Sequence, residues 1–132
     1  MIKFGHVALS VSDLKRSIAF YSKHFGLRCA KKYAHKDSRL EIVLLKKGDI
    51  TLELFEFKEF NPLPLYRQDL NDDLHTLGIK HFSLETKNIE NIYKKFKKAR
   101  IVFATGLRTF DSGKRYFFIK DPDGILVEIM EI

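Results

Sequence analysis

The sequence predicts an α+β fold built from two copies of one βαβββ module. The first observation is an internal repeat, since a shift of 75 residues superimposes similar apolar patterns and the same ionisable positions. The second is periodicity, because strand-like alternation surrounds one helix-like stretch in each half. The third is length, since 132 residues suit one domain of ordinary size. We therefore predict a single domain over 1–132, with module one at 1–57, a linker at 58–77 and module two at 78–132.

The first module opens with an alternating segment and then a helix that begins at Ser12 or Asp13 and ends at Gly26. Ser and Asp side chains accept hydrogen bonds from the free amides at a helix start, and Gly adopts the left-handed backbone common at a helix end. Three further alternating segments follow this helix. The predicted strands of the module lie at 2–11, 28–36, 39–46 and 50–57.

The second module repeats this order after a polar, proline-containing linker in which we predict a short helix. Its own helix lies between Lys87 and Arg100, where apolar residues recur at helical spacing. The segment Asp121-Pro122-Asp123-Gly124 is a strong turn signal, because Pro presets its dihedral angle and Gly tolerates positive ones. The last two strands therefore form a hairpin. The predicted strands lie at 79–87, 101–109, 114–120 and 124–131.

The net charge of +7 comes largely from lysines of the second helix. We interpret them as a solvated helix face, because no helix-turn-helix, zinc-finger or aromatic-basic signature of nucleic-acid binding accompanies them. The same charge can attract an anionic substrate.

No apolar run reaches membrane-spanning length, and the single cysteine, Cys29, excludes an internal disulfide. We expect a cytoplasmic protein without nucleic-acid or membrane partners, in which Cys29 packs within a strand.

Four ionisable residues occupy equivalent positions in the two modules, and the separation from His to Glu is the same in both. Strand alternation places each of them on the face opposite the helix, directed into one cleft. A carboxylate between large apolar neighbours needs a compensating charge, and a cation is the simplest one. Two imidazoles and two carboxylates suit zinc, nickel, cobalt, manganese or iron. A hydrogen-bonded core histidine or a rim glutamate is the alternative for each residue taken alone. The four residues are His6, Glu53, His81 and Glu128.

Together these motifs resemble the vicinal oxygen chelate superfamily, and within it the short bacterial glyoxalase I proteins (lactoylglutathione lyases). The resemblance covers the whole chain and rests on the motifs 6–11, 52–54, 79–84 and 121–128. It implies that the paired modules curl into a half-open barrel around a metal cleft. It also implies one divalent metal ion, nickel, cobalt or zinc, and a homodimer with its sites at the interface. The implied metal ligands are His6, Glu53, His81 and Glu128.

The reaction implied by the resemblance is isomerisation of a 2-oxoaldehyde hemithioacetal to a 2-hydroxyacyl thioester, as in methylglyoxal detoxification. A Lewis-acidic metal stabilises the charge that develops on adjacent oxygens when a proton leaves carbon. The resemblance assigns the proton transfer first to Glu128, with Glu53 as its opposite partner. His6 and His81 remain ligands only.

Substrate-binding residues are predicted from alternation and charge. Phe55, Phe57 and Met130 alternate onto the cleft face and are predicted to wall the pocket, with filling of the core as the alternative. Arg108 and Lys114, with the neighbouring Arg115, are candidates to hold a carboxylate or phosphate, with surface solvation as their alternative.

Two departures from the family pattern concern the thiol. Ser10 and Phe57 stand where glutathione-using glyoxalases carry Arg and Asn. Another thiol, or an acyl-coenzyme A, therefore stays open as the substrate.

Other members of the superfamily fit the residues less well. Methylmalonyl-coenzyme A epimerases carry Gln where this chain has Glu53, whereas extradiol dioxygenases and fosfomycin-modifying enzymes rely on three protein ligands. A non-catalytic module resembling the bleomycin-sequestering proteins would lack the ligands altogether. The four matching positions favour the lyase over these alternatives.

Overall fold

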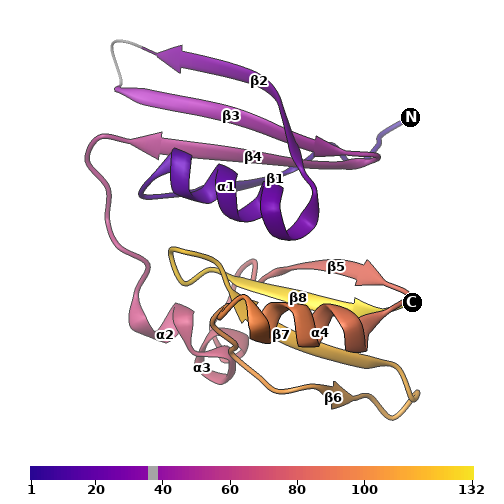
Figure 1. The fold of residues 1–132 in the computed structure, drawn as a ribbon. Helices are drawn as coiled ribbons and strands as arrows, with labels where there is room; N and C mark the ends of the chain where they lie inside the picture. Colours follow the sequence, from indigo (N-terminus) through magenta and orange to yellow (C-terminus); the bar gives the residue numbers. More distant parts are fainter. Residues whose placement is uncertain (36–38) are drawn as a thin grey trace. The chain divides into compact units, whose positions relative to one another are not determined.

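The computed structural model describes residues 1–35 and 39–132, and the chain divides into two compact units, Met1–Pro62 and Leu63–Ile132. The division falls within the predicted linker. Each unit contains a four-stranded mixed sheet with one longer helix along it (Figure 1). The α+β class and the two repeated modules are therefore confirmed, and the curl of the modules around a cleft stays a prediction.

The first unit contains β1 (Val7–Ser10), α1 (Leu14–Phe25), β2 (Arg28–His35), β3 (Leu40–Lys47) and β4 (Ile50–Phe57). The strand order is β1-β4-β3-β2, with β1 parallel to β4 and the other neighbours antiparallel. The predicted strand 2–11 is shorter than expected. The parallel register starts at Val7 opposite Leu52, and because β4 begins only at Ile50, the residues before Gly5 have no strand beside them among the described residues of this unit. Residue 36 of the predicted second strand lies outside the described residues.

The helix α1 begins and ends at the predicted caps. Asp13 Oδ1 accepts a hydrogen bond from the Arg16 amide at 2.9 Å, and Glu56 Oε2 of β4 accepts one from the Leu14 amide at 2.6 Å. Gly26 ends the helix with a φ of 73°, in the left-handed region. These contacts satisfy amides and carbonyls that have no partner within the helix itself.

We expect Gly26→Ala to lower the free energy of unfolding by about 1 to 2 kcal/mol, the cost of a left-handed backbone for a residue with a Cβ. The new Cβ would lie 3.2 Å from Lys47 Nζ, the far end of a flexible side chain, so the cost comes from the backbone. Urea unfolding measures it. Gly5→Ala is the matched control, because nothing lies within 4 Å of a Cβ at that position. Equal stability of the two variants would contradict the argument.

The second unit contains α2 (Leu65–Gln68), α3 (Leu70–His75), β5 (Phe82–Thr86), α4 (Ile89–Lys98), β6 (Arg108–Thr109), β7 (Arg115–Lys120) and β8 (Leu126–Glu131). Its strand order, β5-β8-β7-β6, repeats that of the first unit. The parallel pair also repeats, because Val7 opposite Leu52 becomes Phe82 opposite Val127 after the same 75-residue shift. The linker prediction of one short helix is corrected to two, α2 and α3.

The predicted strand 101–109 is wrong for most of its length. Only Arg108–Thr109 forms β6, preceded by an isolated bridge between Phe103 and Ile119. The reason is that a side chain, and not a neighbouring strand, accepts one of the backbone hydrogen bonds of β7 here. The Thr105 hydroxyl accepts the hydrogen bond of the Phe118 amide at 3.0 Å, and the amides of residues 104 and 105 both donate to the Phe118 carbonyl.

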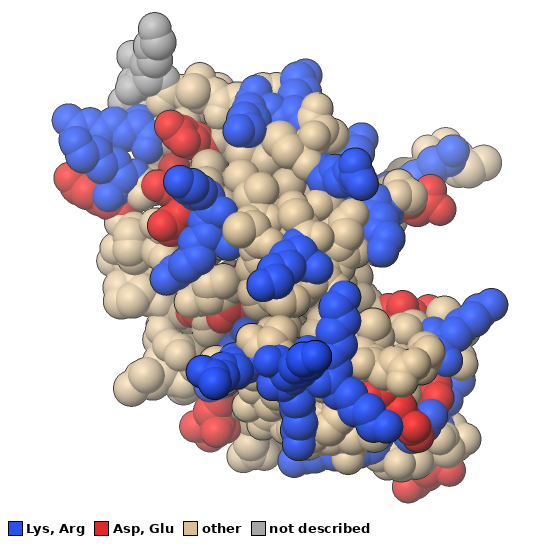
Figure 2. Space-filling model, in the orientation of Figure 1, with Lys and Arg blue, Asp and Glu red and all other residues tan. Residues whose placement is uncertain are grey.

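The helix α4 has one buried face and one exposed, basic face. Its buried residues, Ile89 and Phe96, face the sheet, whereas its lysines are exposed on the other side. Figure 2 shows Lys and Arg side chains gathered over this helix. The interpretation of the charge as a solvated face agrees with this burial pattern. Across residues 1–35 and 39–132, no helix combines the length and apolar character needed to cross a membrane.

The prediction that Cys29 packs within a strand is wrong, because the residue is exposed. It lies in β2, whose residues are all exposed and which, among the described strands, pairs only with β3 and so forms an edge of the sheet. A register shift between Cys29 and Lys31 further interrupts the pairing at this point.

Candidate metal centre

The first unit brings His6 and Glu53 together. His6 directly precedes β1, and Glu53 lies on the neighbouring strand β4, opposite Ala8. The imidazole Nε2 lies 3.6 Å from the carboxylate Oε1, with the His6 side chain 46% exposed and the Glu53 side chain 19% exposed. The flanking Leu52 and Leu54 are buried on the face toward α1. Glu53 therefore lies on the opposite face of the sheet, which we call the ligand face.

The second unit brings His81 and Glu128 together in the same way. His81 Nε2 lies 3.5 Å from Glu128 Oε2, and both side chains are less exposed than their counterparts in the first unit, at 22% and 12%. The ring of Phe118 packs against the imidazole nearly at right angles, with 4.8 Å between centroids. Among the described residues, His81 Nδ1 is buried and has no hydrogen-bond partner. Packing on Phe118 therefore orients this imidazole.

The geometry of both pairs fits a shared cation. Donor atoms about 2.1 Å from one tetrahedral metal ion lie about 3.4 Å apart, close to the two Nε2–Oε distances. Those distances exceed the usual length of an N–H···O hydrogen bond. In the part of the chain that the structure describes, no lysine or arginine forms an ion pair with Glu53 or Glu128. Histidine and carboxylate are also the donor types that such metals take in proteins.

Each unit supplies two of the four predicted donors. Within residues 1–35 and 39–132, the structure forms no group of three or more His, Cys, Asp or Glu side chains around one point. The structure therefore joins His6 with Glu53, and His81 with Glu128. The complete set of four ligands stays a proposal.

The predicted substrate residues lie on these ligand faces or at their margins. Phe55 is half-buried and Phe57 is 39% exposed on β4, and Met130 is half-buried on β8. Arg108 and Lys114 are both exposed. A pocket of about 290 Å³ is lined by Phe57 together with Arg39, Lys58 and Glu59.

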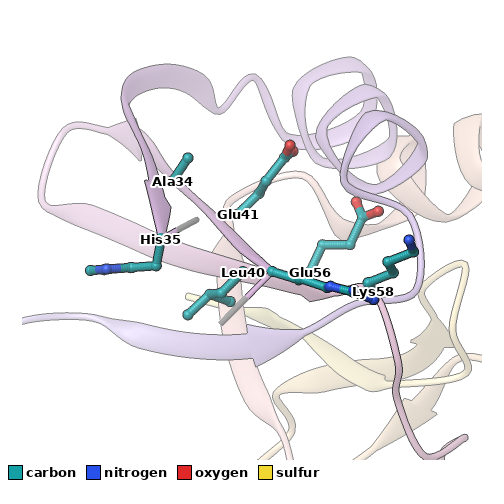
Figure 3. A pocket seen from close by; sticks show the side chains of 7 residues that line it. Ala34, His35, Leu40, Glu41, Glu56 and Lys58 are labelled. Carbon is teal, nitrogen blue, oxygen red and sulfur yellow. The ribbon is translucent and has the colours of Figure 1, made fainter. Parts of the chain in front are cut away.

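A neighbouring pocket in the first unit, which shares Arg39 and Lys58 with the one lined by Phe57, contains none of the predicted site residues. It has a volume of about 380 Å³ and lies where the β2–β3 hairpin meets the end of β4 (Figure 3). Its charges are mixed, and one of its carboxylates, Glu56, already accepts the hydrogen bond of the α1 amide. The lining residues are Ala34, His35, Arg39, Leu40, Glu41, Glu56 and Lys58.

The prediction from sequence missed the aromatic residues around the second pair. Phe118 lies opposite Glu128, and Tyr116 opposite Met130, so both belong to the ligand face of the second unit. Their signal was present in the run Arg115–Lys120. Alternation in that strand, aligned with the final hairpin, would have placed them beside Glu128.

Arg115 has a different role from the anion binding considered for it. Its guanidinium donates to Glu131 Oε1 at 2.6 Å and to Glu90 Oε1 at 2.5 Å, which joins β7, β8 and the first turn of α4. The hydrogen bonds from Arg115 lower the pKa of Glu131 below its ordinary value of 4.5. The pKa of Arg115 is raised by its hydrogen bonds to Glu131 and Glu90.

We expect this ion pair to make stability fall in acid. A carboxyl whose pKa is lower in the folded state than in the unfolded one stabilises the fold fully above its ordinary pKa, here 4.5. That contribution is lost as the pH falls through the lower, folded value. Urea unfolding of the wild type and of Glu131→Gln at pH 7 and pH 3 measures it. The variant should be the less stable at pH 7, and the difference from the wild type should be smaller at pH 3. A difference independent of pH would contradict the assignment.

Known proteins are similar to this chain over nearly its whole length. A family model, Glyoxalase/Bleomycin resistance protein/Dioxygenase superfamily, matches residues 3–129. Mitochondrial methylmalonyl-CoA epimerase of Homo sapiens is 25% identical over 131 residues, covering 96% of this chain and 72% of that protein. Lactoylglutathione lyase of Pseudomonas aeruginosa is 25% identical over 146 residues, covering 97% and 81%. The crystal structure of a glyoxalase family protein from Enterococcus faecalis has a TM-score of 0.83 at 26% identity, covering 98% of this chain and 97% of that one.

Proposed function

The chain belongs to the glyoxalase/bleomycin resistance protein/dioxygenase superfamily, and from that premise we propose that it is a metal-dependent lyase of the glyoxalase I type. The proposed reaction converts the hemithioacetal of a 2-oxoaldehyde to a 2-hydroxyacyl thioester. The observation that carries the proposal is the duplicated His–Glu pair, at equivalent positions of the repeat and with Nε2–Oε distances of 3.6 and 3.5 Å. A repeat that keeps the same two donors in both halves supports one ion held by four ligands.

We propose nickel, cobalt or zinc as the divalent ion, held by His6, Glu53, His81 and Glu128. Members of the superfamily commonly bind a divalent metal. When bound, such an ion supplies Lewis-acid stabilisation of negative charge on two adjacent substrate oxygens. The two imidazoles hold the ion, and packing of His81 on Phe118 keeps that ring oriented.

Glu128 is the proposed proton carrier. It would take the proton from one substrate carbon and return it to the next, which requires a carboxylate beside the reacting atoms. Its side chain is 12% exposed, against 19% for Glu53, so its oxygens are the better shielded from water. Phe55 and Met130, half-buried on the two ligand faces, would exclude water from the intermediate. Glu53 is then the second carboxylate of the set.

The thiol and the assembly are parts of the same proposal. Ser10 and Phe57 occupy the positions where glutathione-using glyoxalases are expected to carry Arg and Asn. Neither side chain provides the charge or the amide of those residues. A thiol other than glutathione therefore stays a candidate. We also propose a homodimer that binds its small-molecule substrate at the interface, in the cytoplasm. Sedimentation of the purified protein tests the dimer.

The test of the function is metal-dependent thioester formation. Metal-stripped protein is reconstituted separately with nickel, cobalt and zinc, and thioester absorbance is followed with methylglyoxal and each of several thiols, glutathione included. Turnover that appears only after metal addition supports the proposal. Tight metal binding without thioester formation from any thiol would contradict the lyase assignment while leaving the metal site intact.

A further inference from the structure

The backbone of Phe118 is held, on its side away from β8, by the segment between α4 and β6. The Thr105 hydroxyl accepts the hydrogen bond of the Phe118 amide at 3.0 Å, and the amides of residues 104 and 105 donate to the Phe118 carbonyl at 2.9 and 3.2 Å. Thr105 is 7% exposed, so its hydroxyl is largely shielded from water. The position of Phe118 therefore depends on a buried hydroxyl where a sheet would normally have a neighbouring strand.

Phe118 lies beside both proposed ligands of the second unit. Its ring meets the His81 imidazole nearly at right angles, with 4.8 Å between centroids, and its backbone lies opposite Glu128 of β8. Because the amide and carbonyl of Phe118 are directed away from β8, Phe118 and Glu128 form a non-hydrogen-bonded pair, the kind in which opposite side chains lie closest. A displacement of Phe118 would thus alter the surroundings of both His81 and Glu128.

The segment that carries Thr105 is itself fixed from the helix side of the sheet. The ring of Phe103 packs against Tyr93 of α4 at 5.0 Å and against Phe117 at 5.4 Å between centroids. Phe103 also forms the isolated bridge with Ile119. The Thr105 hydroxyl is therefore presented to Phe118 from a packed segment, two residues beyond this anchor.

The first unit forms the equivalent sheet in a different way. Leu44 lies opposite Glu53, and on its other side it pairs with Lys31 of β2. Leu44 is aliphatic, and the His6 side chain is 46% exposed, against 22% for His81. The module can therefore form its sheet without a buried hydroxyl or a ring at these positions, and the second unit has both beside its His–Glu pair.

We propose that Thr105 is a positioning residue of the metal centre, whose hydroxyl acts through Phe118 to fix the orientation of the His81 imidazole. The inference rests on the proposed function, in which His81 is a metal ligand. A metal-bound His usually donates its second ring nitrogen to an acceptor that fixes the ring. Among the described residues, His81 Nδ1 is buried and has no such partner, so packing must supply the orientation. Residues that orient a ligand in this way contribute about 10- to 100-fold to metal affinity.

The test compares Thr105→Val, which removes the acceptor and keeps the shape of the side chain, with Thr105→Ser, which keeps the acceptor. In metal-free protein, Thr105→Val should move the ring-proton NMR resonances of His81 toward their positions in Phe118→Leu, and Thr105→Ser should leave them unchanged. Zinc affinity, measured by competition with a chelator, should fall about tenfold in Thr105→Val and in Phe118→Leu, and should be restored in Thr105→Ser.

Ile119→Val separates positioning from a general loss of stability. Ile119 is fully buried on the opposite face of β7, so this variant should be less stable in urea and still keep the wild-type His81 resonances and zinc affinity. Unchanged resonances or unchanged zinc affinity in Thr105→Val would overturn the inference. Wild-type affinity in Phe118→Leu, or equal losses of affinity in Thr105→Ser or Ile119→Val, would also overturn it.

The same measurements distinguish this inference from the function on which it rests. A wild type that binds no zinc would contradict the metal centre and the inference together. Zinc binding that depends on Thr105, without thioester formation from any thiol, would contradict the lyase and keep the positioning role. Metal-dependent thioester formation with wild-type zinc affinity in Thr105→Val would keep the lyase and remove the positioning role.

Discussion

Glu128→Gln should lower the rate of thioester formation by about 10² to 10⁴, the contribution of a positioned acid–base group. An amide keeps the size of the side chain and one oxygen near His81 Nε2, now 3.5 Å from the carboxylate. It has no basic oxygen to accept a proton from carbon. The measurement is kcat with saturating hemithioacetal, together with metal content of the same sample.

The controls distinguish the lost base from a lost fold. Asp49→Asn removes a carboxylate at an exposed position between β3 and β4 and should leave the rate unchanged. Glu53→Gln should retain more activity than Glu128→Gln, because Glu128 is the proposed proton carrier. If Glu128→Gln kept more than a tenth of the wild-type rate, or if Glu53→Gln alone were inactive, the assignment of the base would be wrong.

Asp73→Asn should lower the free energy of unfolding by about 3 kcal/mol, toward the lower end for breaking a buried ion pair. Asp73 is fully buried in α3, and its Oδ1 accepts from Arg67 Nε at 2.5 Å and lies 3.6 Å from Lys80 Nζ. Asn would leave both cations without their charge partner. The effect stays at the lower end because the Arg67 side chain is 32% exposed and keeps contact with water. Urea unfolding at pH 7 measures the loss.

The same substitution should also weaken the second His–Glu pair. Arg67 donates to the Ile79 carbonyl at 2.9 Å, and Lys80 donates to the Asp73 carbonyl at 2.7 Å, so the cluster fixes the two residues directly before His81. Metal affinity should therefore fall along with stability. Asp72→Asn, at the adjacent exposed position, is the matched control and should change stability by only a few tenths of a kcal/mol. Equal effects of the two variants would show that the buried charge has no special role.

The sequence predicted the elements whose signals are local. Asp13 and Gly26 marked the ends of α1, and Asp121–Gly124 marked the final turn, because caps and turns depend on a few neighbouring residues. The repeat also predicted that the same His and Glu occupy equivalent positions in the two modules. Their pairing within each unit comes from the structure, where the parallel pairing of β1 with β4 brings His6 beside Glu53.

The features that the sequence analysis predicted wrongly or missed depend on contacts between residues far apart in the chain. The strand predicted at 101–109 was lost because the Thr105 side chain takes the hydrogen bond that a ladder partner would have made. The exposure of Cys29 depends on β2 being an edge strand, which only the sheet order reveals. The burial of Asp73 between two cations likewise joins α2, α3 and the segment before β5, and a polar linker sequence gives no sign of it.

The two sheets have the same register, so their residues can be compared position by position. Some equivalent positions carry the same residue and others do not. At equivalent positions both copies carry the same His and Glu, as the proposed ion held by four ligands requires. The residue opposite the glutamate on the neighbouring strand differs, since it is Leu44 in the first unit and Phe118 in the second. A duplicated module can thus keep one ionisable pair at equivalent positions while the side chains packed around that pair differ between the two copies.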